Sequence, residues 1–155
     1  MDLARNLKID SVSRLHPTHP LSIGPTQTVA DAVAAMRRDE VGCVLVCKEG
    51  RVVGVFTERD LMRRVLAAGK AMATPVAECM TANPVVVSPK EPIAAAVRRM
   101  EEGGYRHLPV VDEGGHVVGI LSVKRIVHYL VEHFPATIYN LPPDPGVVQQ
   151  EREGA

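Results

Sequence analysis

Residues 43–61 read CVLVCKEGRVVGVFTERDL, and residues 107–126 read HLPVVDEGGHVVGILSVKRI, with one extra residue in the turn of the second stretch. Each stretch has an apolar run, a Gly-containing turn, a second apolar run and then the start of a helical pattern. Short apolar runs around a Gly turn are typical of a β-hairpin. The sequence therefore predicts the same hairpin and helix start twice.

The repetition extends beyond the hairpins. A shift of 64 positions superimposes matching residues before the inserted residue, and a shift of 65 does so after it. Self-similarity at a fixed spacing indicates a duplicated structural unit. We place the two copies at residues 8–70 and 72–134. The matched pairs include Val12 and Val76, Pro20 and Pro84, Pro25 and Pro89, Met36 and Met100, and Gly54 and Gly119.

Each copy predicts the same order of strands and helices. A helix follows the first extended segment, because apolar residues recur at i, i+4 and i+7 after residues 28 and 92. Thr28 with Asp31 is typical of a helix start, and Pro92 is expected at the first helical position of the second copy. The predicted strands are 21–23, 43–47 and 51–56, then 85–87, 107–111 and 116–121, and the closing helices lie near 58–67 and 123–132.

The order strand-helix-strand-strand-helix, given twice, predicts an α/β fold. Each copy is too small to bury its own sheet face, so we expect the copies to pack sheet to sheet as one pseudo-symmetric pair. Residues 135–155 are rich in proline, end in a polar run and show no periodicity. We expect them to form an extended or disordered arm.

Composition excludes several classes of protein. The chain has 155 residues, of which 46% are hydrophobic, and its 18 Lys and Arg balance 18 Asp and Glu. Zero formal charge argues against a nucleic-acid partner. The sequence has no apolar run like that of a signal peptide or membrane span, so we expect no membrane partner and a cytoplasmic location. Cys43 and Cys47 share one strand face and are expected to be buried, reduced thiols.

The start of the closing helix differs between the copies. Thr57 and Asp60 have the spacing of a capping box, which needs no ligand to explain it. In the second copy Ser122 can still cap the helix, but Lys124 and Arg125 place two cations in the first turn. Cations there oppose the helix dipole unless they point into solvent, and a bound anion would turn that cost into a gain. Capping and ligand binding both stay open at these helix starts.

The two clefts between the copies cannot be equivalent. The second copy has the basic sequence YRH at 105–107, where the first copy has the uncharged VGC at 41–43. We therefore expect one cleft to bind a ligand and the other to be inactive.

Enzyme and metal motifs are absent from the sequence. It contains no GxxxxGK phosphate loop, no GxSxG elbow and no HExxH helix. A hydrolase that uses His107 as a base would lack a nucleophile or metal partner. His16 and His19 have a spacing open to a metal ion, but they lie in a proline-containing loop with no Cys or carboxylate nearby in sequence. We expect neither an enzyme nor a metal site.

The segments VAECM at 76–80, RHLPVVD at 106–112 and GVFTERD at 54–60 make residues 12–134 resemble a tandem pair of CBS domains, the regulatory domains named after cystathionine β-synthase. The resemblance implies clefts that often hold adenosine-containing ligands such as AMP, ATP or S-adenosylmethionine. It implies that Asp60 binds the ribose with Thr57 beside it, and that Val55 and Val85 flank the base. It further implies that Arg106, His107 and Lys124 face the phosphates.

The chain departs from the family pattern in its second cleft. Arg125 stands where a second ribose-binding aspartate would be, and Gly42 and Cys43 stand where basic residues would be. We therefore expect one nucleotide per chain. The basic groups favour AMP, ADP or ATP over S-adenosylmethionine, whose sulfonium is itself a cation.

These observations predict a non-catalytic regulatory or sensor module that binds an adenine nucleotide, requires no cofactor and acts on an unidentified partner protein. The alternative is a structural or partner-binding module without a ligand. We also expect a homodimer, because family members often form disc-like dimers and because one pair leaves apolar helix faces to cover. Those faces comprise Leu61, Val65, Ile126, Leu130 and Phe134.

Overall fold

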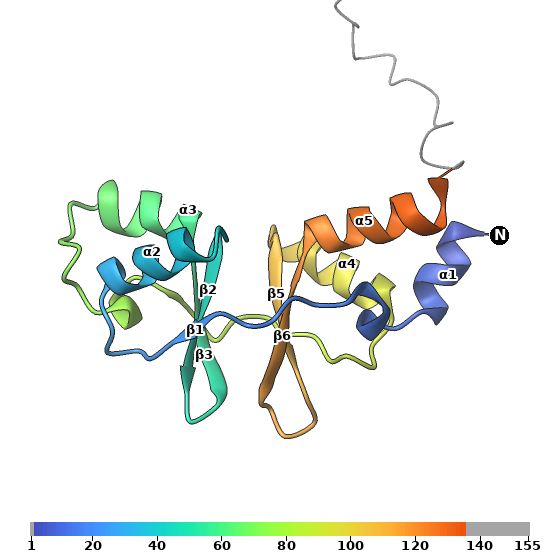
Figure 1. Cartoon of the computed structure of the whole chain (residues 1–155), viewed down its shortest axis with the longest axis horizontal. Helices are drawn as coiled ribbons and strands as arrows, with labels where there is room; N and C mark the ends of the chain where they lie inside the picture. The colour runs from blue at the N-terminus through green and yellow to red at the C-terminus, as the bar shows by residue number, and fades with distance from the viewer. Residues whose placement is uncertain (1, 136–155) are drawn as a thin grey trace, which may run out of the picture.

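The structure, a computed structural model, describes residues 2–135, which form two halves side by side with a hairpin in each (Figure 1). The first half contains β1 (Ser22–Ile23), α2 (Val29–Arg38), β2 (Cys43–Lys48), β3 (Arg51–Thr57), α3 (Glu58–Asp60) and its π-helical continuation η2 (Leu61–Leu66). The second half contains α4 (Ile93–Gly103), β5 (His107–Val111), β6 (Val117–Ser122) and α5 (Val123–His133). The mixed α/β fold and the repeated order confirm the sequence prediction, except that residues 85–87 do not form the predicted strand: Val87 makes only a single bridge to β5.

The sheets of the two halves follow the same plan, but within residues 2–135 the first has four strands and the second has two. In the first half β2 and β3 form an antiparallel hairpin, β1 adds parallel to β2, and β4 (Thr81–Ala82) adds antiparallel to β3. In the second half β5 and β6 form the hairpin. Val87 bridges β5 in parallel and Thr18 bridges β6 in antiparallel orientation, in the places that β1 and β4 take in the first half. The edges of the second sheet are therefore reduced to single bridges.

Each copy gives its opening segment to the other half. η1 (Val12–Leu15) comes first in the chain, yet Val12 and Leu15 lie in the core of the second half. η3 (Val76–Glu78) precedes the second copy, yet Val76 and Cys79 lie in the core of the first half. The N-terminal helix α1 (Leu3–Ile9) likewise lies beside the second half (Figure 1). The halves are therefore joined by exchanged segments.

A third cluster of buried side chains lies between the sheets. Cys43, Leu45 and Val55 of the first hairpin pack with Ile120 of β6. The hairpin turns also meet, because the Val117 N–H donates to the Gly50 carbonyl at 3.2 Å. This packing fulfils the expectation that the copies join through their sheets. The described cysteines are free thiols. Cys43 is buried as expected, whereas Cys47 is only partly buried, because the register shifts between Val46 and Cys47. Burial, with a smaller effect of Asp60, raises the pKa of Cys43 to about 12.

Local details differ from the predicted elements. Pro92 is the N-cap of α4 rather than its first helical residue, with an extended backbone. The first closing helix is one α-turn that continues as a π-helix, whereas α5 is regular. The predicted arm lies almost entirely outside the described residues. Within residues 2–135 no helix is long and apolar enough to span a membrane.

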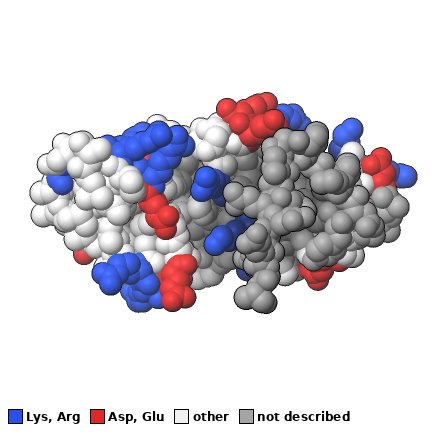
Figure 2. Space-filling model, turned by 90° about the horizontal axis from the view of Figure 1, so that it is seen from above, with Lys and Arg blue, Asp and Glu red and all other residues white. Residues whose placement is uncertain are grey.

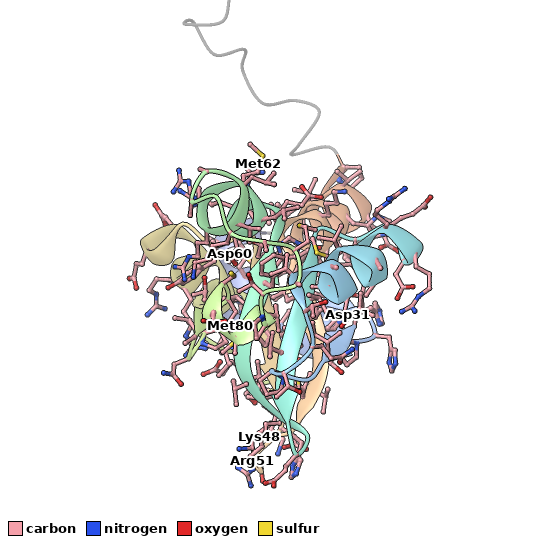
Figure 3. The ribbon with its side chains drawn as sticks, turned by 90° about the vertical axis from the view of Figure 1, so that its left-hand side faces the viewer. Asp31, Lys48, Arg51, Asp60, Met62 and Met80 are labelled. Carbon is pink, nitrogen blue, oxygen red and sulfur yellow. The ribbon has the colours of Figure 1, made fainter. Side chains whose placement is uncertain are left out.

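The helix faces expected to stay open for a dimer are covered by the chain itself. Val65, Ile126 and Phe134 are buried, and Leu61 and Leu130 pack partly buried against the same cores. This part of the dimer reasoning was wrong, because the helical period places these residues toward the core. The exposed apolar side chains of η2 are instead Met62 and Leu66, which are 64% and 61% exposed. Figure 3 shows Met62 projecting from the outer surface.

Candidate functional site

A cavity of about 730 Å³ opens between the two halves. One wall comes from the end of β3 and the start of α3, the opposite wall from residues 103–107, and the floor from the segment after β4. Ligand pockets in proteins commonly enclose about 300–1,000 Å³. The cavity is therefore large enough for a nucleotide-sized molecule.

The structure brings together most of the residues expected at a ligand site. Val55, Thr57 and Asp60 line the cavity from the first half. Val85 lines it from the connecting segment, and the second half contributes Arg106 and His107. These residues are up to 52 positions apart in sequence (55 to 107) and share one cavity only because the repeats face each other.

Lys124 is placed differently from the other expected residues. It does not belong to the cavity lining, although its charge is close enough to His107 to lower the pKa of that imidazole. In the internal repeat Lys124 corresponds to Arg59, and Arg59 does line the cavity. The first copy thus gives this cavity a cation, Arg59, at the position that Lys124 has in the second copy, and Lys124 lies near His107 but outside the lining.

Asp60 forms the capping box that the sequence suggested. The Thr57 backbone N–H donates to Asp60 Oδ2 at 3.1 Å, and the Asp60 N–H donates to the Thr57 hydroxyl at 3.2 Å. The Thr57 hydroxyl lies 3.2 Å from the same Oδ2 and donates to it. Asp60 is the buried charged residue of the described chain, only 7% exposed. The cap therefore fixes the carboxylate in the cavity wall.

The other carboxylate oxygen of Asp60 faces the connecting segment. The Thr81 hydroxyl donates to Asp60 Oδ1 at 3.2 Å, and Arg64 Nε lies 3.4 Å from the same oxygen. Arg64 also donates from Nη1 to the Met80 carbonyl at 2.8 Å. In Figure 3 the labels of Asp60 and Met80 lie one above the other, on the half that faces the viewer. The carboxylate thus ties the helix start to the segment that leads into the second copy.

Sequence reasoning missed several charged residues of the lining. Arg59, Arg63 and Arg64 add cations from α3 and η2, and Glu58 adds an anion. Helical spacing was the signal for Arg63 and Arg64, because residues three and four positions after Asp60 lie on its side of a helix. Tyr105 also lines the cavity, and its ring lies so close over Gly103 that a Cβ there would be 2.0 Å from it.

His107 lies half-buried between opposite charges. Burial is the main cause that lowers the pKa of its imidazole, and the cations of Lys124 and Arg106 lower it further, while Glu58 raises it. A neutral imidazole offers one donor and one acceptor, whereas the protonated form offers two donors. An anion bound beside His107 would favour the protonated form.

The equivalent helix start in the second half is built differently. Ser122 occupies the N-cap position of α5, but its side chain makes no capping hydrogen bond. Arg125 replaces the aspartate there, so neither a capping box nor a carboxylate acceptor forms. The two helix starts are therefore chemically unequal: one presents a carboxylate and the other presents a guanidinium.

The described charges on the upper face are mixed in sign. Figure 2 shows basic and acidic side chains intermixed over the described part of the upper face. Within residues 2–135 no three His, Cys, Asp or Glu side chains gather in a metal-binding arrangement.

Comparison with known proteins identifies the architecture. A family model described as CBS domain matches residues 12–67 and again residues 76–132. The Meiotically up-regulated gene 70 protein of Schizosaccharomyces pombe is 41% identical over 108 residues, which make up 69% of this chain and 15% of that protein. The chain therefore spans only a small part of this relative.

Solved structures agree with the family model. The CBS domain structure of NE2398 matches with a TM-score of 0.73 at 32% identity, covering 79% of this chain and 98% of that one. The CBS domain protein PAE2072 from Pyrobaculum aerophilum, solved in complex with AMP, matches with a TM-score of 0.71 at 25% identity, covering 79% and 99%. These matches confirm the resemblance found in the sequence.

Proposed function

Because this chain belongs to the CBS domain family, with its two domains at residues 12–67 and 76–132, we propose that it is a regulatory module that binds AMP, ADP or ATP between them. The observation that carries the proposal is the unequal chemistry of the cavity walls. A fixed carboxylate lies on one wall, and Arg106 and His107 lie on the other. Apolar Val55 and Val85 complete the lining.

The base, the ribose and the phosphates of a nucleotide each match side chains in or beside this lining. A carboxylate accepts hydrogen bonds from a ribose diol, so Asp60 with Thr57 is the proposed ribose site. Cationic side chains form charge-assisted hydrogen bonds with phosphates, a role proposed for Arg106 and His107 and, from outside the lining, for Lys124. Val55 and Val85 provide apolar surface for the base. The AMP complex of PAE2072 supports this reading.

The same lining favours nucleotides over S-adenosylmethionine. Arg59, Arg63, Arg64 and Arg106 are all cavity residues, and a sulfonium would add another positive charge among them. Like charges in a partly enclosed site repel more strongly than in water. We propose one nucleotide per chain, no required cofactor, and no catalytic step.

We also propose that the module acts on a partner protein as a homodimer. Met62 and Leu66 of η2 and Val123 and Val127 of α5 are exposed apolar residues on the two closing helices. A second copy would cover them in a symmetric, self-complementary contact. Sedimentation at micromolar concentration with and without AMP tests this, and a monomer under both conditions would contradict it.

Nucleotide-dependent melting tests the function itself. A ligand that binds only the folded chain stabilises it by RT ln(1 + [L]/Kd), about 2.7 kcal/mol at a hundredfold excess over Kd. We expect AMP, ADP or ATP to raise the melting temperature more than S-adenosylmethionine or NADH. No shift with any of them would favour the alternative, a partner-binding module without a ligand.

A further inference from the structure

We infer that Arg64 makes the cavity selective for phosphorylated ligands, because its guanidinium holds the open edge of the Asp60 carboxylate and must leave when a ribose binds there. The inference rests on the nucleotide-binding function proposed above. It assigns to Arg64 a role that differs from that of the other cavity cations.

The contacts of Asp60 leave a ligand one place to enter. Oδ2 accepts from the Thr57 backbone and hydroxyl, and these bonds hold the helix start. Oδ1 accepts from the Thr81 hydroxyl, which holds the connecting segment. Among the contacts made within residues 2–135, the ion pair with Arg64 is the one that neither element needs. A diol that reaches this carboxylate therefore competes with Arg64.

The ion pair between Arg64 and Asp60 is weak enough for a ligand to displace. Arg64 Nε lies 3.4 Å from Asp60 Oδ1, and the Arg64 side chain is 51% exposed while that of Asp60 is 9% exposed. Solvent screens the exposed guanidinium, and a distance of 3.4 Å is long for a hydrogen bond, so this pair contributes less free energy than a short, fully buried one. The donor Nη1 is held separately by the Met80 carbonyl at 2.8 Å. The guanidinium can therefore leave the carboxylate and remain at the cavity wall.

Displacement of Arg64 from Asp60 has a different free-energy cost for adenosine and for AMP. Adenosine would displace Arg64 from its anion and give the guanidinium no replacement. AMP would displace it in the same way, but its phosphate brings a new anion into a cavity that Arg64 lines. Arg64 therefore weakens the binding of the neutral nucleoside and favours the nucleotide.

Calorimetry of adenosine and AMP with wild type and Arg64→Gln tests this inference. We expect the variant to bind adenosine about two- to fivefold more tightly, as the loss of a weak competing ion pair predicts. We expect AMP to bind more weakly, so the dissociation constant of adenosine divided by that of AMP falls in the variant. Because Arg64 is half-exposed, the variant should fold, which its melting temperature verifies.

Arg63→Gln is the matched control, since it removes a neighbouring cavity cation that is not paired with Asp60. It should weaken AMP without tightening adenosine. If wild type binds AMP but Arg64→Gln binds adenosine no more tightly than wild type, Arg64 does not compete with the ribose and the inference is wrong. If wild type binds neither ligand, the proposed function fails and takes the inference with it.

Discussion

Replacement of Asp60 by alanine separates its two roles, in the helix start and in the ribose site. The substitution removes the acceptor for the Thr57 N–H, the partner of the Thr81 hydroxyl and the anion beside Arg64. Loss of an N-terminal capping interaction costs about 0.5–2 kcal/mol. The melting temperature of a chain of this size falls by about 2–4 °C per kcal/mol. We therefore expect Asp60→Ala to melt up to about 8 °C earlier.

The effect on binding is separate and larger. Hydrogen bonds to a charged acceptor contribute about 1.5–3 kcal/mol each, and part of this is offset because the ribose displaces Arg64. A net loss of 1.4 kcal/mol corresponds to tenfold in affinity, so we expect a loss of about ten- to hundredfold. AMP and adenosine should weaken alike, since both carry the ribose diol.

The matched control is Asp31→Ala in the capping box of α2. There the Thr28 N–H donates to Asp31 Oδ2 at 3.0 Å and the Asp31 N–H donates to the Thr28 hydroxyl at 3.1 Å, in an exposed position that does not line the cavity. This variant should lose stability and keep its nucleotide affinity. Melting and calorimetry must be measured on the same samples. If Asp60→Ala melts earlier yet binds AMP and adenosine as wild type does, Asp60 is only a helix cap.

Further predictions concern the phosphates, the packing and the titration of the cavity. Lys124→Ala should weaken the binding of AMP and ATP, leave the binding of adenosine unchanged and reduce the salt dependence of nucleotide binding. These effects should be smaller than those of Arg106→Ala, because Arg106 lines the cavity and Lys124 does not. Calorimetry that finds a larger loss of affinity for Lys124→Ala than for Arg106→Ala would contradict this. The same titrations should saturate at one nucleotide per chain, and two equal sites would refute the inequality of the clefts. Gly119→Ala would bring a Cβ to 2.9 Å from Pro17 Cβ, so the free energy of unfolding in urea should fall by about 1–3 kcal/mol. An unchanged urea midpoint would show that the segment around Pro17 moves aside without cost. Burial holds the pKa of His107 below its ordinary value, so the unfolded chain takes up the proton at a higher pH than the folded chain does. The contribution of neutral His107 to the free energy of unfolding is therefore complete above about pH 6.5 and is lost as the pH falls below about 6.5. His107→Gln should reduce this loss between pH 7.5 and pH 5.5, and identical pH dependence in both proteins would contradict the assignment.

The sequence predicted the repeat and most elements, because both depend on patterns local to each copy. Residues 107–111 were predicted as a strand and form β5. The exchange of opening segments could not be predicted, since Val12 and Val76 have the same surroundings in sequence whichever half they join. An apolar pattern predicts that a residue is buried, but it does not predict in which of the two cores the residue lies.

The candidate site was predicted only in part. Motif resemblance identified Thr57 and Asp60, and the structure shows their capping box, while their part in ribose binding stays a prediction. The pairing of Asp60 with Arg64 depends on side-chain positions at the turn into a π-helix, which no spacing rule fixes. Lys124 was favoured because two cations at a helix start needed an explanation. Its counterpart Arg59 lies between Glu58 and Asp60, so its charge is balanced locally and the sequence pattern does not single it out.

A single copy of the repeat would lack part of its own core. A single copy cut out at residues 72–134 would leave behind Val12 and Leu15, which fill its core, and would carry away Val76 and Cys79, which fill the core of the other half. Two such single copies could complete each other only by trading these segments between molecules. Linkage of the two copies in one chain makes this exchange intramolecular, so it does not depend on the protein concentration.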